Sequence, residues 1–182
     1  MNGSKQLLRR AQRGDARAIE ALVELWWPVA YRTAYAIVGP SGHAEDVAQE
    51  SVLAAVRALR SFDRSRPVAP WLNRIVANRA LDSLRVTGRR SEVTLAEIPS
   101  EVAIPEPDGI SDELMQALLT LEPRDRAIVV LRHLVGFGSG EIAEMLDTKP
   151  GTVRSALHRS LSSLRDQLDP AYPVPERKVA CD

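Results

Sequence analysis

The chain has 182 residues, with 24 Lys/Arg balanced by 24 Asp/Glu, and one cysteine, Cys181. A single cysteine excludes an internal disulfide and a thiolate metal site, and no apolar run is long enough for a membrane-spanning helix. The N-terminus lacks the apolar core of a signal peptide. We therefore expect a cytoplasmic protein that makes no membrane contact of its own.

The balanced total charge hides a strong asymmetry along the chain. Residues 1–90 carry fifteen Lys/Arg against eight Asp/Glu, a net charge of about +7. Residues 91–113 carry seven acidic residues and no basic one, and from residue 114 onward nine of each sign occur. This pattern predicts a basic first domain (1–90), a flexible, acidic, Pro-containing linker (91–111), a second domain (112–169) and a disordered tail (170–182).

Apolar residues at helical spacing predict that the first domain is all-α, and no strand pattern of note occurs anywhere in the chain. Residues 4–36 read as helical with an interruption at Gly14, after which Asp15 can cap a second helix. Pro28 indicates a kink or a boundary in that helix. Further helices are expected at about 44–60 and 69–87.

The helix at 44–60 has two faces of different character. Its small and aliphatic residues form one face, which we expect to be buried. The other face repeats at spacings of three and four and consists of Asp46, Gln49, Glu50, Leu53 and Arg57. Taken from the residues alone, this face is more typical of a solvated surface than of a docking surface for a partner protein with Leu53 at its centre.

The loop at 61–67 and the helix after it combine cationic and aromatic side chains. The loop holds Phe62, Arg64 and Arg66. The helix at 69–87 carries a polar stripe made of Arg74, Asn78, Asp82 and Arg85, with Trp71 in line and Arg79 to one side. Arginines neutralise phosphates and aromatic rings stack on unpaired bases, so the arginines predict contact with single-stranded nucleic acid. Trp71 considered alone is more typical of a buried residue.

The segment from Ser139 to Leu168 reads as a short helix, a tight turn and a longer helix. In the longer helix an apolar stripe is formed by Val153, Leu157, Leu161, Leu164 and Leu168. The opposite face is short, polar and basic, and consists of Thr152, Ser155 and Arg159, flanked by Arg154 and His158. A helix with such a face suits the DNA major groove, so we expect a helix-turn-helix rather than an ordinary amphipathic surface helix. Helices at 112–120 and 124–135 would complete this C-terminal domain.

No arrangement of residues in the sequence predicts catalysis. His43, His133 and His158 are scattered without metal-ligand spacing. No Gly-rich phosphate loop and no serine nucleophile elbow occur. We therefore expect no enzyme activity, no metal and no cofactor.

Two blocks of sequence together resemble a known family. The first runs from Ala44-Glu-Asp-Val-Ala-Gln-Glu-Ser-Val-Leu-Ala-Ala to Phe62-Asp, and continues through Pro70-Trp-Leu-Asn-Arg-Ile-Val-Ala-Asn-Arg. The second holds Leu121-Glu-Pro-Arg-Asp-Arg-Ala-Ile-Val-Val-Leu, then Glu141-Ile-Ala-Glu-Met-Leu and Gly151-Thr-Val-Arg-Ser-Ala-Leu-His-Arg. In this order and with this gap, they resemble regions two and four of the extracytoplasmic-function (ECF) family of bacterial RNA polymerase sigma factors.

The resemblance implies an alternative sigma factor, with two small helical domains on an acidic tether. Its partners would be core RNA polymerase (the β′ clamp helices and the β flap), promoter DNA and an anti-sigma factor, without a cofactor. The face formed by Asp46, Gln49, Glu50, Leu53 and Arg57 would dock on the clamp helices, which reverses the interpretation of that face as merely solvated. The loop from Phe62 to Pro67 matches the one that captures a flipped base of the minus-ten element. The melted minus-ten strand would be held by Phe62, Arg64, Arg66, Trp71, Arg74, Asn78 and Arg79. The minus-thirty-five element would be read by Thr152, Arg154, Ser155, His158 and Arg159.

Two other functions are compatible with parts of the pattern. The first is a stand-alone helix-turn-helix regulator that binds duplex DNA without polymerase. The second is an interaction module that only sequesters a partner, in which Arg154 and Arg159 would be dispensable.

Overall fold

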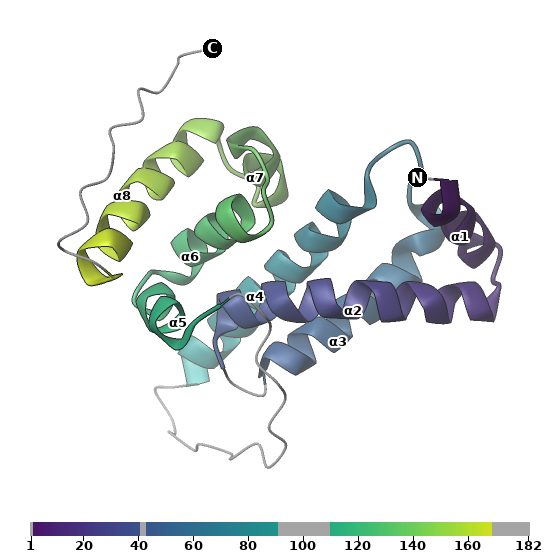
Figure 1. The fold of residues 1–182 in the computed structure, drawn as a ribbon, viewed down its shortest axis with the longest axis horizontal. Helices are drawn as coiled ribbons and strands as arrows, with labels where there is room; N and C mark the ends of the chain where they lie inside the picture. The colour runs from purple at the N-terminus through teal and green to yellow at the C-terminus, as the bar shows by residue number, and fades with distance from the viewer. Residues whose placement is uncertain (1, 41–42, 91–109, 169–182) are drawn as a thin grey trace.

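The computed structural model describes residues 2–40, 43–90 and 110–168 (Figure 1). Within these ranges the chain is built from helices and contains no strand, which confirms the all-α prediction. The elements are α1 (Asn2–Gln12), α2 (Ala16–Val38), α3 (His43–Ala58), the 3₁₀ turn η1 (Leu59–Ser61), α4 (Val68–Arg90), α5 (Asp112–Leu119), α6 (Pro123–Val129), the π-helical turn η2 (Val130–Leu134), α7 (Ser139–Met145) and α8 (Pro150–Leu168). None of these helices combines the length and apolar character needed to cross a bilayer. The predicted disordered tail and most of the predicted linker lie outside the described residues.

Helices α1 to α4 form the first unit, in which α2 begins where the sequence predicts. The Asp15 carboxylate accepts a hydrogen bond from the Ala18 backbone N–H at 3.2 Å and thereby caps α2. Arg10 Nε also donates to this carboxylate at 2.8 Å, and that bond lowers the pKa of Asp15. Helix α2 continues through Pro28 to Val38, so no helix boundary falls at that proline. Pro28 removes one backbone N–H donor from α2, and the helix of 23 residues accommodates this loss.

Small residues allow α2, α3 and α4 to pack closely. Ala30, Ala34, Ala48 and Ala55 are completely inaccessible to solvent. A buried hydrogen bond also links two of these helices: Thr33 Oγ1 of α2 donates to Asn73 Oδ1 of α4 at 3.0 Å. A buried hydrogen bond between two helices fixes their register more strictly than apolar packing does, because leaving either group unpaired costs about 1–3 kcal/mol.

Helices α5 to α8 form the second unit, which begins slightly before the predicted boundary. Ile110 is buried, and the Ser111 hydroxyl accepts from the Leu114 backbone N–H and caps α5. At the other end of the unit, α7 and α8 form the expected helix-turn-helix (Figure 1). Asp147 adopts the left-handed conformation there, with φ of 48°, and the Thr148 N–H closes the end of α7 on the Ala143 carbonyl at 2.9 Å.

The two units pack against each other at the C-terminal end of α2, and their buried apolar side chains form one continuous cluster. Gly39 caps α2 with φ of 93°, a conformation that favours glycine. A Cβ at this position would also lie 2.9 Å from Leu119 Cδ2 of α5. The glycine therefore serves two needs at once: it turns the chain and lets α5 approach.

Arg126 of α6 joins the two units through hydrogen bonds. The residue is only 6% exposed. Its Nη1 donates to the Ile37 carbonyl of α2 at 2.7 Å, and Nη2 donates to the carbonyls of Leu119 and Leu121 at 3.2 and 3.0 Å. Burial lowers the pKa of this guanidinium, while the nearby Glu122 carboxylate acts in the opposite direction. The cation is thus held by carbonyls at the ends of two helices, where the helix dipole favours positive charge.

We expect the Arg126→Met substitution to destabilise the protein and to loosen the contact between the units. Methionine keeps most of the side-chain volume but leaves three carbonyls without their charged donor, a loss of about 1.5–3 kcal/mol. At about 2–4 °C per kcal/mol, Tm should fall by roughly 3–12 °C, and the radius of gyration measured by small-angle scattering should increase. Arg165→Met, at an exposed position in the last turn of α8, is the matched control. If the Arg126 variant had the same Tm as the control variant, Arg126 would not be the residue that joins the two units.

Candidate polymerase and nucleic-acid interfaces

The predicted docking face of α3 lies on the surface. The opposite face of the helix is buried through Ala44, Val47, Ala48, Ser51, Val52 and Ala55. The five predicted docking residues, Asp46, Gln49, Glu50, Leu53 and Arg57, are all exposed. Leu53, at the centre of this face, leaves 46% of its surface in solvent.

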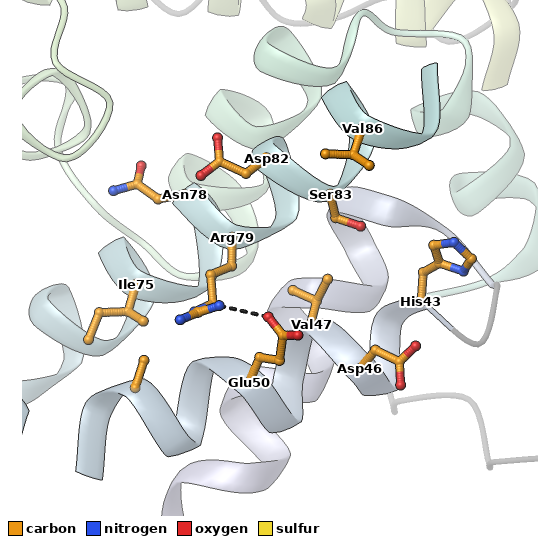
Figure 2. A pocket seen from close by; sticks show the side chains of 11 residues that line it. His43, Asp46, Val47, Glu50, Ile75, Asn78, Arg79, Asp82, Ser83 and Val86 are labelled. Atoms are coloured by element: carbon orange, nitrogen blue, oxygen red, sulfur yellow. Dashed lines mark hydrogen bonds and ion pairs between the residues drawn. The ribbon is translucent and has the colours of Figure 1, made fainter. Parts of the chain in front are cut away.

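A groove of about 660 Å³ separates this face from α4 (Figure 2). Asp46 and Glu50 line it from α3, and Asn78 and Arg79 line it from α4. Figure 2 shows Glu50 and Arg79 pointing toward each other, and Arg79 Nη1 donates to Glu50 Oε2 at 2.7 Å. The structure therefore brings two residues predicted to serve polymerase and DNA binding, respectively, into one ion pair.

The loop that precedes α4 is ordered by its own side chains. The Asp63 carboxylate accepts from the Ser65 backbone N–H at 2.9 Å and from the Ser65 hydroxyl at 2.7 Å. These two bonds, the backbone one first, lower the pKa of Asp63. The turn leaves the side chains of Arg64 and Arg66 exposed, so both cations are accessible to a phosphate.

The structure places Phe62 beneath this loop rather than on its surface. Its ring is 8% exposed and lies 4.6 Å from the ring of Trp71, centroid to centroid. Trp71 is half-buried, and its ring makes an edge contact with Trp26 at 5.9 Å. These three rings support the loop from below, so Phe62 has little surface left for stacking on a base in this arrangement.

Arg74 opens onto a second cleft, of about 600 Å³, that both units line. The first unit contributes Phe62, Arg66 and Trp71 besides Arg74, and α7 contributes Glu141, Glu144 and Met145. With Asp63 of the loop, three carboxylates thus share a cleft with two of the arginines predicted to hold DNA. Of the remaining stripe residues, Asn78 is exposed and Arg79 is partly exposed.

The recognition helix α8 shows the predicted polar face to solvent. All five predicted residues, Thr152, Arg154, Ser155, His158 and Arg159, are exposed. Arg159 Nη2 lies 3.5 Å from Asp125 Oδ2 of α6, a long contact between side chains that are 66% and 28% exposed. On the opposite side Val153, Ala156, Leu157, Ser160 and Leu164 are buried, whereas Leu168 is 44% exposed, so the predicted apolar stripe does not extend to the end of the helix.

Several residues that shape these surfaces had no signal in the sequence. Gln12 contacts η1 and Phe62, and Asn73 fixes the register of α4 against α2. Glu141 lines the second cleft and also caps α7, because its Oε2 accepts from the Gly138 N–H at 2.8 Å. Among the described residues no group of three or more His, Cys, Asp or Glu side chains is placed to hold a metal ion.

Comparison with protein families matches two models in the order expected. The model described as "Sigma-70 region 2" matches residues 22–90, and the one described as "Sigma-70, region 4" matches residues 111–164. The first range contains the α3 face, the loop and α4, and the second contains the helix-turn-helix.

Curated relatives and solved structures extend the match along most of the chain. The chain is 30% identical to the ECF RNA polymerase sigma factor SigW of Bacillus subtilis over 179 residues, covering 90% of this chain and 96% of that one. It is 35% identical to the ECF RNA polymerase sigma-E factor of Escherichia coli K12, covering 90% and 93%. Among solved structures, RpoE in complex with the anti-sigma factor NepR from Bartonella quintana has a TM-score of 0.68 at 24% identity, covering 84% of this chain and 98% of that chain. CnrH in complex with the cytosolic domain of CnrY has a TM-score of 0.65 at 24% identity, covering 93% and 99%.

The chain has two helical units. One contains a helix-turn-helix, and the other carries an arginine-rich helix beside the exposed face of α3. Together with the two family matches, this arrangement defines a sigma-70-type transcription factor. The chain belongs to the ECF family of RNA polymerase sigma factors, and it is an alternative sigma factor that directs promoter-specific transcription. The stand-alone regulator considered above receives no support from these comparisons.

We expect the ion pair between Glu50 and Arg79 to contribute little to stability. Both side chains are substantially exposed, 66% and 38%, and exposed pairs typically contribute about 0.2–1 kcal/mol. A double-mutant cycle with Glu50→Gln and Arg79→Gln, followed by urea unfolding, should give a coupling energy in that range that decreases as salt is added. A coupling above about 2 kcal/mol would mean that the pair is structural and that Arg79 is not readily available to a phosphate.

Proposed function

We propose that the exposed face of α3 is the surface that docks on core RNA polymerase, at the β′ clamp helices. Its residues are Asp46, Gln49, Glu50, Leu53 and Arg57. The observation that supports this most is Leu53, an apolar side chain held in solvent at the centre of a charged face. Such a residue becomes fully buried only when a partner covers it. The second unit would contact the β flap.

In the same proposal the loop and α4 hold the melted minus-ten strand. Arg64, Arg66, Arg74 and Arg79 supply the cations, and Asn78 supplies an amide that can read a base edge. Phe62 and Trp71 belong to this site as its support, since their rings pack under the loop. The minus-thirty-five element would be read by Thr152, Arg154, Ser155, His158 and Arg159, which form one solvent-facing surface of α8.

An anti-sigma factor is a proposed further partner. RpoE of Bartonella quintana and CnrH, which share the fold, were solved in complex with the anti-sigma factor NepR and the cytosolic domain of CnrY, respectively. The groove between α3 and α4 offers an inhibitor access to the polymerase face and to the arginine helix at once. With these partners, the proposal includes a cytoplasmic location.

The recognition helix can be tested with promoters found by sequencing the transcripts that the wild-type holoenzyme makes from genomic DNA. We expect Arg154→Ala and Arg159→Ala each to lower run-off transcription about tenfold, because one base or phosphate contact contributes about 1–3 kcal/mol. Binding to core polymerase should not change. Arg165→Ala, one to three turns further along the same helix and also exposed, is the control. Full activity of the Arg154→Ala, Arg159→Ala double variant would favour a module that only sequesters a partner.

The docking face can be tested by pull-down with purified core RNA polymerase. Leu53→Ala should weaken the association about tenfold or more, because the leucine would lose its burial at the centre of the interface. Its Tm should stay within about 2 °C of wild type, because an exposed leucine contributes little to folding. Leu25→Ala, which removes another exposed leucine (56%) from α2, serves as control. Wild-type binding by the Leu53 variant, or tight sequence-specific duplex binding in the absence of polymerase, would argue against the proposal.

A further inference from the structure

Gln12, at the end of α1, reaches across to the segment that leads into the minus-ten loop. Its Nε2 donates to the carbonyl of Leu59 at 2.9 Å and to the carbonyl of Phe62 at 2.9 Å. These partners are 47 and 50 residues away along the chain, and the contact is partly buried. One amide group therefore spans the whole of the 3₁₀ turn η1, which runs from Leu59 to Ser61.

Both carbonyls lie in or just after η1, at the end of a helical segment, where backbone carbonyls lack a hydrogen-bond donor from a following turn. The Leu59 carbonyl already accepts from the Phe62 N–H at 3.1 Å, which closes η1. The Phe62 residue is then extended, with φ of −69° and ψ of 126°, and the chain departs from the helix there. Gln12 therefore acts as a C-terminal cap supplied by another helix, and it fixes the point and direction at which the loop leaves the scaffold.

The rest of the loop is fixed relative to that same point. The Phe62 ring lies against Trp71 of α4, which holds the side chain of the residue whose carbonyl Gln12 binds. The next residue, Asp63, begins the turn in which Ser65 donates to its carboxylate. A change in the direction of the Phe62 carbonyl would therefore move Arg64 and Arg66, since the hydrogen bonds of the described loop residues after Phe62 lie within the loop itself.

We propose that Gln12 is a positioning residue for the minus-ten loop: by binding the Leu59 and Phe62 carbonyls it sets the loop at the angle required to receive a base of the melted strand. This inference rests on the proposed minus-ten role of residues 62–67. It adds a residue outside the range that matches the region 2 model, which begins at residue 22. Gln12 itself touches no DNA in the proposal, and its effect is confined to the one base that the loop receives.

The experiment uses holoenzyme assembled from core polymerase and the full-length chain. A pool of single-stranded DNA with randomised positions is selected on it, and the bound strands are sequenced. Gln12→Met keeps the side-chain length and removes both donors, and Gln12→Ala repeats the measurement with a stronger helix former. Gln6→Met, at an exposed glutamine on the same helix, is the matched control. Tm and affinity for core polymerase are measured for every variant.

We expect the wild type and the Gln6 variant to enrich the same motif. The Gln12 variants should lose about tenfold in discrimination at one position of that motif and keep the others, because only the base received by the loop loses its contacts. An unchanged motif in the Gln12 variants would overturn the inference. So would a uniform loss of recovery with the motif preserved, because that pattern reports general destabilisation. If the wild type itself enriched no motif, the proposed minus-ten site would fail first, and Gln12 would have no loop function to support.

Discussion

The arrangement of this molecule depends on one buried guanidinium. Arg126 has no carboxylate within bonding distance, and carbonyls from α2, from the end of α5 and from the turn after α5 share its positive charge. Carbonyls at helix ends carry partial negative charge that no intrahelical partner cancels, so a cation there satisfies several acceptors at once. Nε of the same group has no hydrogen-bond partner among the described residues, so the bonds to those three carbonyls hold the guanidinium in place. The close approach of Leu119 to Gly39 then follows, because the α2 end must lie against α5 for the bonds to form.

This packing has an electrostatic consequence for the proposed minus-ten site. It brings Glu141 and Glu144 of α7 to the cleft that Arg66 and Arg74 line. With Asp63, phosphates that enter this cleft meet three carboxylates as well as two guanidinium groups, so the field that attracts nucleic acid is weaker than the arginines alone would produce. By contrast, all five predicted contact residues of α8 stay in solvent in the same arrangement. The two proposed DNA-binding surfaces therefore differ in their electrostatic surroundings while the units are packed together.

Features set by local sequence could be predicted, and features set by contacts between distant residues could not. Spacing within one helix is enough to predict the helices, the Asp15 cap, the solvent-exposed polar face of α8 and the exposure of Leu53. Phe62 is different: helical periodicity cannot show that Trp71, on the next helix, covers its ring. Gln12 finds its acceptors 47 and 50 residues away, and Arg126 finds one of its three acceptors 89 residues away, among backbone carbonyls that leave no mark on the sequence. Pro28 does not end α2, which continues to Val38.

The arginines of this chain illustrate why residue type alone does not determine role. Arg126 is almost fully buried and is committed to three carbonyls, so its loss would leave acceptors unpaired in the interior. Arg79 and Arg159 each contact a carboxylate at the surface, where the pairing is weak enough for a phosphate to compete with it. Arg64 and Arg74 are exposed, and their guanidinium groups make no hydrogen bond or ion pair with other described residues, so a phosphate that binds them has no such contact to displace. The arginines thus differ in the hydrogen bonds that each guanidinium already makes within the fold. Arg126 uses its bonds to hold the units together, whereas the arginines with weak contacts or none are the ones proposed to bind nucleic acid.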